Sequence, residues 1–366
     1  MLEVEILHLL ALQNIEGVGD ITAKKLLNHC GSAEEIFKAK PAQLASIDGI
    51  GKKTIQNILN KNAFVEAEKE LQFIQKEKIK VLFYKNDDYP EKLKHCIDGP
   101  IVLFTSGNID LQQKRIISIV GTRQITSYGI DFCKKFIADL APLDPIIVSG
   151  FAYGVDIIAH QAAVDNDLQT IGVLAHGLNQ IYPKTHKRYM SKIESNGGFM
   201  TDFWSTSNPD KENFIKRNRI VAGISEATVV IESAEKGGSL VTATMANDYN
   251  REVFAVPGRA TDKYSQGCNN LIKTQKANLL TSAADLVYNL NWDIVKKGKS
   301  IQKQLFVSLE PEEQNLFDFL KINGKEHIDI IALEINIPVF KLSSLLLNME
   351  LKGVVRPLPG KVFEII

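Results

Sequence analysis

Short runs of apolar, mostly β-branched residues recur through the middle of this chain, and each run is followed by a glycine turn. The clearest run covers residues 116–120 and breaks at Gly121, with Arg123 two residues later and an amphipathic stretch behind it. This order is typical of a buried strand that leads into a helix. Because free N–H groups at a helix start favour anions, Arg123 is either a phosphate ligand or a surface residue that caps the loop.

The same pattern of strand and glycine turn returns four times, and this repetition predicts the fold class. The later runs cover residues 146–148, 170–174, 227–231 and 253–256. Alternating strands and helices predict an α/β fold with a parallel sheet covered by helices on both faces. Ligands of such sheets bind beyond the carboxyl ends of the strands, so we expect the glycine turns to converge on one crevice. The G-x-G-x-x-G motif with a downstream acid is absent, so no dinucleotide cofactor is expected.

The length and charge of the chain limit what its partners can be. Its 366 residues are enough for two or three domains. Lys and Arg together number 43, as do Asp and Glu, so any nucleic-acid partner must be held by a local basic patch. Four scattered cysteines predict reduced thiols, and neither a signal peptide nor a membrane span is apparent. We therefore expect a cytoplasmic protein that contacts no membrane.

Residues 1–80 have helical patterning and contain a doubled glycine motif. GVG at 17–19 precedes one helical stretch, and GIG at 49–51 precedes another that begins with two lysines. The repeat resembles the helix–hairpin–helix module, in which glycines let backbone N–H groups approach a DNA phosphate. The alternative is a pair of tight turns that need glycine for positive φ.

Three further parts complete the chain. Residues 81–114 hold two short strand candidates and form an entry arm to a core that we place at 81–290. Residues 291–308 are rich in lysine, have little apolar periodicity and predict a linker. Residues 309–366 predict a winged-helix domain. Its would-be recognition helix, from 339 onward, begins with one basic residue in six, which favours a partner-binding role over the reading of a major groove.

The segment 184–219 is the densest basic and aromatic part of the chain. It contains eight Lys or Arg and four Asp or Glu, and Phe203, Trp204 and Phe214 lie among them. Cations that neutralise phosphates, together with rings on which bases stack, are what single-stranded nucleic acid requires. The alternative is a solvated loop whose aromatic residues cover the edge of the sheet.

Seven motifs occur in an order that points to one family. They are SIVGTR (118–123), SGFAYGVDIIAH (149–160), YP (182–183), FIKRNRIVAGIS (214–225), GGSLVTA (237–243), VFAVPG (253–258) and GCNNLI (267–272). As a set they resemble the DprA/Smf family of DNA-processing proteins, over nearly the whole chain. The resemblance implies an extended Rossmann-like core that binds single-stranded DNA without catalysis or a cofactor. It also implies a homodimer that protects incoming DNA and helps to load the RecA recombinase during natural transformation.

The resemblance also implies which residues touch DNA. Arg123 matches a phosphate-contacting arginine of the family, 214–219 its F-x-x-R-N-R segment and 237–239 its small-residue phosphate turn. The expected DNA-binding residues are Gly121, Arg123, Gly150, Lys211, Phe214, Arg217, Asn218, Arg219, Gly237, Gly238, Ser239, Asn269 and Lys273. Arg123, Phe214 and Arg219 should share one concavity. The departures from the family pattern are Ala175, Gly237 and Lys276.

Two rival interpretations remain. The GGSLVTA turn also resembles the loop of LOG-type nucleotide phosphoribohydrolases, but the nearest acid after it, Asp248, is too far along to match theirs. Alternatively, the sheet is a scaffold and the terminal domains recruit partners. The histidines lack the paired spacing of metal ligands, so no metal is expected, and Asp156 should cap a helix or brace the crevice.

Overall fold

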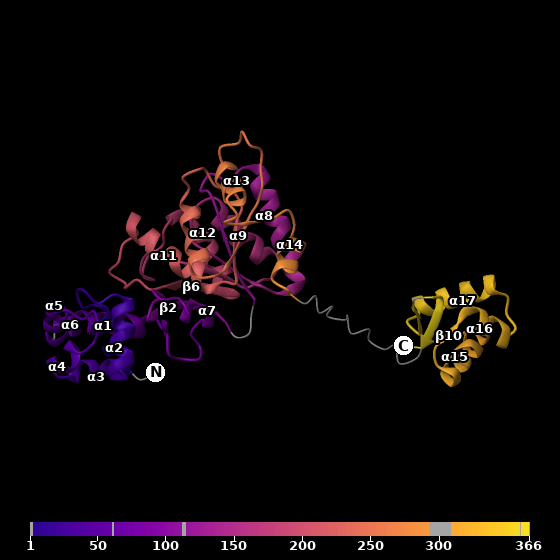
Figure 1. Cartoon of the computed structure of the whole chain (residues 1–366), viewed down its shortest axis with the longest axis horizontal. Helices are drawn as coiled ribbons and strands as arrows, with labels where there is room; N and C mark the ends of the chain where they lie inside the picture. Colours follow the sequence, from indigo (N-terminus) through magenta and orange to yellow (C-terminus); the bar gives the residue numbers. More distant parts are fainter. Residues whose placement is uncertain (1–2, 61, 112–114, 293–308, 359, 366) are drawn as a thin grey trace. The chain divides into compact units, whose positions relative to one another are not determined.

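The chain divides into two compact units, residues 1–293 and 294–366 (Figure 1). The computed structural model describes residues 3–60, 62–111, 115–292, 309–358 and 360–365. The predicted linker, 291–308, therefore lies almost wholly outside the described residues.

The first unit begins with helices that pack around their own apolar residues. They are α1 (Glu3–Gln13), α2 (Asp20–Cys30), α3 (Ala33–Lys38), α4 (Pro41–Ala45), α5 (Lys52–Leu59) and α6 (Asn62–Lys76). Gly17 and Gly49, in the turns before α2 and α5, have φ angles of +87° and +83°. Only glycine adopts these angles without steric cost, so both copies of the doubled motif form tight turns that require glycine.

The strands that the structure describes in this unit form a single nine-stranded sheet. They are β1 (Lys80–Phe83), β2 (Val102–Gly107), β3 (Ile116–Val120), β4 (Ile146–Ser149), β5 (Thr170–Val173), β6 (Gly197–Thr201), β7 (Ala227–Val230), β8 (Glu252–Ala255) and β9 (Asn278–Leu279). Their order is β1-β2-β6-β5-β4-β3-β7-β8-β9. β1 and β2 pair antiparallel with each other, as do β2 and β6, and the other neighbours are parallel. The predicted α/β class is confirmed.

Alternate residues of the central strand β3 face two different helical layers. Ile117 and Ile119 pack in the buried cluster that includes residues of α8 (Ser127–Leu140) and α9 (Val155–Asp165). Ile116 and Val120 pack on the other face, in a cluster that includes residues of α11 (Lys211–Ile224) and α12 (Gly238–Asp248). Because both faces are covered, β3 is a continuous apolar run rather than an alternating one.

The direction of strand order reverses at β3. From β3 the chain adds β4, β5 and β6 on one side, and later adds β7, β8 and β9 on the other. In doubly wound sheets the crevice at such a reversal is the usual ligand site. Shorter helical segments connect the strands: α7 (Glu91–Lys94), η1 (Ala141–Leu143), η2 (Lys184–Tyr189), α10 (Met190–Ser195) and α13 (Gln266–Lys273). α14 (Ala283–Asn289) follows β9, the last strand of this sheet.

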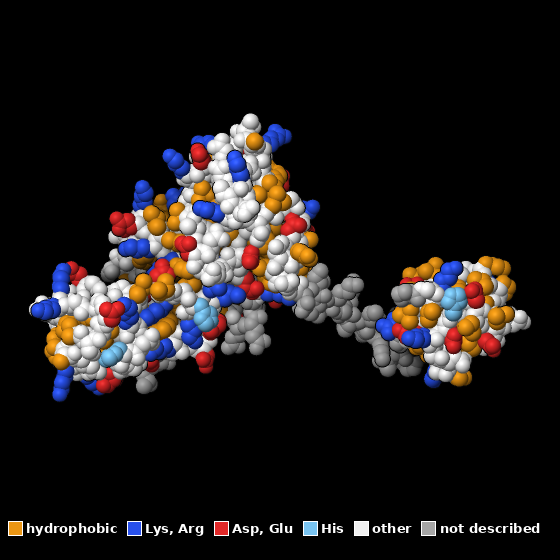
Figure 2. Space-filling view, in the orientation of Figure 1, with side chains coloured by type: hydrophobic (Ala, Val, Ile, Leu, Met, Phe, Trp, Pro, Cys, Tyr) orange, Lys and Arg blue, Asp and Glu red, His pale blue; other side chains and the backbone are white. Residues whose placement is uncertain are grey.

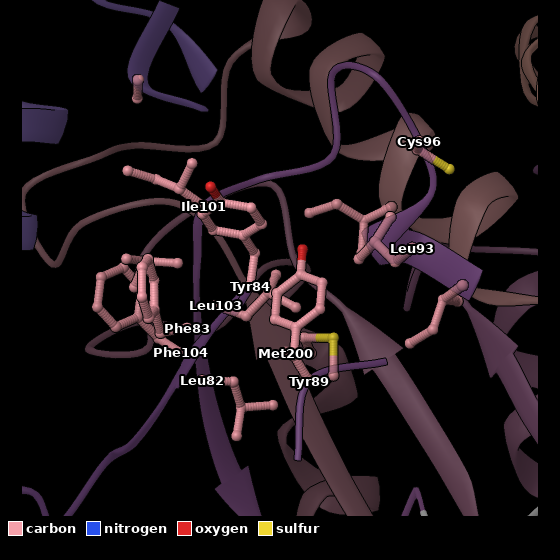
Figure 3. Close-up of a cluster of buried hydrophobic side chains, with 14 of the residues drawn as sticks. Leu82, Phe83, Tyr84, Tyr89, Leu93, Cys96, Ile101, Leu103, Phe104 and Met200 are labelled. Carbon is pink, nitrogen blue, oxygen red and sulfur yellow. The ribbon is translucent and has the colours of Figure 1, made fainter. Parts of the chain in front are cut away.

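The entry arm is held to the sheet by its own apolar side chains. Figure 3 shows Tyr84, Tyr89 and Ile101 close to Leu93 and Met200, the last of which belongs to β6. The Tyr89 hydroxyl donates to the main-chain oxygen of Pro100 at 2.5 Å. The antiparallel edge of the sheet is thereby part of the same core.

The second unit contains three helices and a small sheet among its described residues. The elements are α15 (Pro311–Asn323), β10 (Glu326–His327), α16 (Ile328–Glu334), α17 (Val339–Leu351), β11 (Val355–Leu358) and β12 (Val362–Ile365), with strand order β10-β12-β11. This is the predicted winged-helix arrangement. Within the described parts of the chain, no single helix is long and apolar enough to cross a membrane; α16 and α17 meet that criterion only together, across a bend of 109°.

Candidate nucleic-acid interface

A cavity of about 670 Å³ lies where β3, β4 and β7 end, and it is bordered by α11 and α12. Most of the residues that the sequence assigns to DNA binding line it: Gly121, Arg123, Gly150, Lys211, Phe214, Arg217, Asn218, Gly237, Gly238 and Ser239. Lys and Arg side chains are spread over this end of the unit, around α11, α12 and α13 (Figure 2). The glycine turns after β3, β4 and β7 converge on this crevice at the reversal of strand order, but Gly177 after β5 lies outside its lining and Gly258 after β8 lines another cavity, so the prediction is confirmed only in part.

The turn after β3 fixes the backbone of Arg123 and leaves its side chain exposed. The N–H of Thr122 donates to the Glu232 oxygen at 2.7 Å, and its carbonyl accepts from Val155 N at 3.1 Å. Gly154 has a φ of +77°, and a Cβ there would lie 2.2 Å from the Thr122 oxygen. A larger residue at 154 would displace the turn, so the position of Arg123 depends on Gly154.

The start of α11 places a ring beside Arg123. Asp210 caps this helix, because its carboxylate accepts from Asn213 N at 3.0 Å. The guanidinium of Arg123 lies 5.1 Å from the centre of the Phe214 ring, and the Tyr182 ring centre lies 5.7 Å from the same ring centre. Cation–π attraction of this kind holds Arg123 against the ring at the mouth of the cavity.

Arg217 lies on the same face of α11 as Phe214, one turn further on, but it is buried. It is 4% exposed, and its Nη1 donates to the Val173 oxygen at 2.8 Å. Burial lowers the pKa of Arg217 to about 10, and Asp156 opposes that shift. Burial raises the pKa of Asp156, and Arg217 opposes it in turn. In the lining of the cavity, the buried charges of Arg217 and Asp156 therefore partly neutralise each other. Arg123 and Lys211 are exposed cations of the same lining.

Gly150 makes room for the Arg217 guanidinium. A Cβ at Gly150 would lie 1.9 Å from Arg217 Nη1, whereas a Cβ at Gly238 would meet no described heavy atom within 4 Å. We therefore expect Gly150→Ala to lower the free energy of unfolding by about 2 kcal/mol, as overpacking of a tight site does. Gly238→Ala is the matched control and should unfold at nearly the wild-type urea concentration. Equal midpoints for the two variants would show that Arg217 does not depend on Gly150.

The turn after β7 supplies the start of α12. The first N–H groups of a helix have no partner within it and favour an anion. Ser239 Oγ donates to Ser233 Oγ at 2.9 Å, so this hydroxyl stabilises the turn itself. The open face at Gly238 is where a phosphate has access to these N–H groups.

Arg219 does not line this cavity, which corrects the sequence-based prediction. Its side chain is 14% exposed, Nη1 donates to Asp20 at 3.0 Å, and Nη2 pairs with Asp202. The main-chain oxygen of Asp98 also accepts from it. Burial works to lower the pKa of Arg219, but Asp202 and Asp20 outweigh it and hold that pKa above its ordinary value. Two residues along a helix turn a side chain by about 200°, so Arg217 and Arg219 face opposite ways.

Three other predicted residues lie elsewhere. Trp204 Nε1 donates to Gln13 of α1 at 3.1 Å, and its partly buried ring packs against the apolar cluster that includes the N-terminal helices. Asn269 braces the loop after β8, because its side-chain amide bonds with both the N–H and the oxygen of Gly258. Lys273 is exposed at the end of α13 and outside the cavity lining.

Thr122 and Tyr182 are among the lining residues that the sequence did not assign to the site. Tyr182 belongs to one of the seven motifs, so the sequence contained a signal that could have assigned its ring to the site. Asp156 braces the crevice as expected, since its carboxylate accepts from Ala152 N at 3.2 Å. Within the described ranges, no group of three or more His, Cys, Asp or Glu is placed to hold a metal.

Comparison with protein-family models gives three matches in chain order. Residues 9–61 match a SAM-like helix-hairpin-helix tandem. Residues 80–291 match the model of DNA recombination-mediator protein A. Residues 304–361 match the DprA winged helix domain. Together the matches account for both terminal regions and for the sheet between them.

Individual relatives and solved structures agree with these models. Protein Smf of Synechocystis is 34% identical over 267 residues, which are 72% of this chain and 67% of Smf. DNA processing protein DprA of Streptococcus pneumoniae is 37% identical over 202 residues, 55% of this chain and 71% of that protein. A crystal structure of S. pneumoniae DprA covers 79% of this chain and 98% of its own, at 31% identity and a TM-score of 0.65. A Helicobacter pylori DNA processing protein A, solved to examine its single-stranded DNA binding mode, covers 58% of this chain and 96% of its own, at 27% identity and a TM-score of 0.53.

Proposed function

The chain belongs to the DprA/Smf family of DNA-processing proteins, and we propose that it binds single-stranded DNA in the cavity at the end of β3. One observation carries this proposal: an exposed arginine, Arg123, lies against the ring of Phe214 at the mouth of that cavity. A cation binds a phosphate and an aromatic ring stacks on the face of a base. Every nucleotide of a single strand offers one phosphate and one base, so both interactions can form at any position along it.

The surroundings of this pair support binding without a sequence preference. Lys211 adds a second exposed cation, and the start of α12 offers backbone N–H groups. Phosphate contacts hold any sequence equally well, because they carry no information about the bases. The H. pylori relative was solved for its single-stranded DNA binding mode, which supports the same ligand here.

The finer parts of the proposal concern the fate of the bound strand. We propose that a homodimer protects incoming DNA and passes it to the RecA recombinase in the cytoplasm, during natural transformation. The name of the matching family, a recombination mediator, supports transfer to a recombinase. The described cysteines are all free thiols, which suits a reducing compartment. Phe340 and Leu351 on α17 are 79% and 80% exposed and give the winged helix apolar side chains for a partner.

The proposed activity is binding rather than hydrolysis. In the phosphoribohydrolase pattern a catalytic acid follows the phosphate loop in the chain, and the first acid after Gly238 is Asp248, at the far end of the 11-residue α12. That separation is about 15 Å at the rise of an α-helix. Incubation with nucleoside monophosphates should release no free base, and release of base at a steady rate would favour the hydrolase instead.

The decisive experiment is a salt titration of binding to single-stranded DNA, duplex DNA and RNA of matched length. We expect single-stranded DNA to bind most tightly, with log affinity falling linearly with log salt. Arg123→Ala should lower the affinity for all sequences and reduce the slope by about 0.7, the value for one phosphate contact on a single strand. Lys276→Ala removes an exposed lysine outside the cavity and serves as the control. Unchanged affinity and slope in Arg123→Ala would show that the cavity is not the binding site.

A further inference from the structure

A second cavity, of about 930 Å³, lies on the other side of β7, at the same edge of the sheet. It is formed by the start of α8 and by the loop between β8 and α13, and this loop lies at the end of the unit that carries α13 (Figure 1). Tyr128 and Tyr264 line it together with Arg259 and Lys263. None of these four side chains takes part in the binding proposed above.

The second cavity repeats the arrangement of charge and ring seen in the first. Lys263 Nζ lies 5.5 Å from the centre of the Tyr264 ring, and Arg123 lies 5.1 Å from the centre of Phe214. Tyr128 is 52% exposed, and Arg259 and Lys263 are both exposed. Each cavity thus offers an aromatic face beside a cation, which is the combination that a nucleotide of a single strand requires.

Hydrogen bonds link Tyr264 of the second cavity to the turns after β3 and β7, which border the first cavity. Arg123 lines the first cavity, and the side chain of its neighbour Gln124 accepts a hydrogen bond from the Tyr264 hydroxyl. On the β7 side, Ser233 lines the first cavity, and its N–H donates to the Tyr264 oxygen at 2.7 Å. These two bonds hold Tyr264 beside the residues that border the first cavity, so the two cavities adjoin at the turns after β3 and β7.

The charge of the second cavity also suits a polyanion. Its buried acid, Glu232, accepts from Thr126 N at 2.9 Å and from Thr126 Oγ1 at 2.5 Å. These bonds place the carboxylate at the positive N-terminal end of α8, where its charge is compensated. Asp262 is the other acid of the lining, which also contains two exposed cations, Arg259 and Lys263.

We propose that this second cavity is a further subsite for single-stranded DNA, in which Tyr264 stacks on a base and Arg259 and Lys263 neutralise phosphates. The inference rests on the proposed function, because it extends the same strand past Arg123. It assigns the chain a track with two stacking positions on either side of β7. An oligonucleotide too short to cover both positions uses the first cavity alone.

The test compares wild type and Tyr264→Ala with oligothymidylates that increase from about 4 to about 16 nucleotides, the range of site sizes in such proteins. For the shortest oligomers the two proteins should bind equally. For longer ones Tyr264→Ala should bind at least about fivefold more weakly, the loss of one stacked base. Tyr264→Phe keeps the ring and should restore wild-type affinity. Tyr288→Ala, which removes an 83% exposed tyrosine of α14, is the control.

A double variant keeps the inference testable if Tyr264→Ala fails to fold. Arg259→Ala with Lys263→Ala removes only exposed side chains and should reduce the salt slope for long oligomers by about 1.4 while leaving that for the shortest unchanged. Wild-type slopes and affinities at every length in these variants would overturn the second subsite alone. Failure of wild type to bind any oligomer would overturn the proposed function as well.

Discussion

Replacing Arg219 by alanine is expected to lower the free energy of unfolding by about 3–5 kcal/mol, the cost of removing one partner of a buried ion pair. The substitution leaves Asp202 and Asp20, whose side chains are 9% and 19% exposed, without their shared cation. Asp20 begins α2 and Asp202 follows β6, so Arg219 ties the N-terminal helices to the sheet. The prediction concerns the whole first unit, because these residues belong to one compact body.

Urea unfolding of the full chain measures this effect. Lys53→Ala is the matched control, because Lys53 also pairs with an acid, Glu16, but both side chains are more than three quarters exposed. Such exposed pairs contribute little, so this variant should unfold near the wild-type midpoint. Arg219→Ala that is still folded should bind single-stranded DNA with the wild-type salt slope. If Arg219→Ala unfolded at the wild-type urea concentration and its DNA binding had a reduced salt slope, Arg219 would contact DNA rather than stabilise the fold.

The contrast between Arg217 and Arg219 shows how far sequence reasoning can place a side chain. Helical spacing predicts that Phe214 and Arg217 share a face, and both line the cavity. The fate of Arg219 depends on Asp20, which is 199 residues away in the chain. No local pattern indicates a partner at that distance, so the F-x-x-R-N-R segment assigns Arg217 and Arg219 alike to DNA.

A similar limit applies to the strands. The apolar runs predicted β3, β4, β5, β7 and β8, because strands buried on both faces are continuously apolar. β6 was missed: it begins with Gly197 and Gly198, which leave little apolar signal. Its position beside β2 is set by main-chain hydrogen bonds with Ser106 and its neighbours, and those depend on tertiary structure.

The helix–hairpin–helix repeat likewise has one feature that its sequence predicts and one that it does not. Its glycines predicted both turns correctly. Whether the first turn is free to bind a ligand depends on the residues that contact it in the folded protein. The carboxylate of Asp20, directly after that turn, accepts from Ile101 N at 2.8 Å as well as from Arg219. The first hairpin is therefore engaged inside the protein, which its sequence alone does not reveal.

Phe214→Ala is expected to cause the largest loss of affinity for single-stranded DNA. The Phe214 ring holds Arg123 at 5.1 Å and Arg217 at 5.9 Å, and it offers its face to a base. Its removal takes away one stacked base and releases the guanidinium of Arg123. We expect a cost near the upper end for a stacking residue, about 3 kcal/mol or about 150-fold in affinity.

The salt dependence distinguishes this loss from that of a phosphate contact. Because the phenyl ring neutralises no phosphate, the slope of log affinity against log salt should stay at the wild-type value in Phe214→Ala. Phe214→Tyr keeps an aromatic face and should bind nearly as wild type does, whereas Phe214→Leu keeps much of the apolar volume and should bind almost as weakly as alanine. Equal affinities for the tyrosine and leucine variants would mean that the ring only fills space. Stacking would then have to be abandoned as the source of binding energy in this cavity.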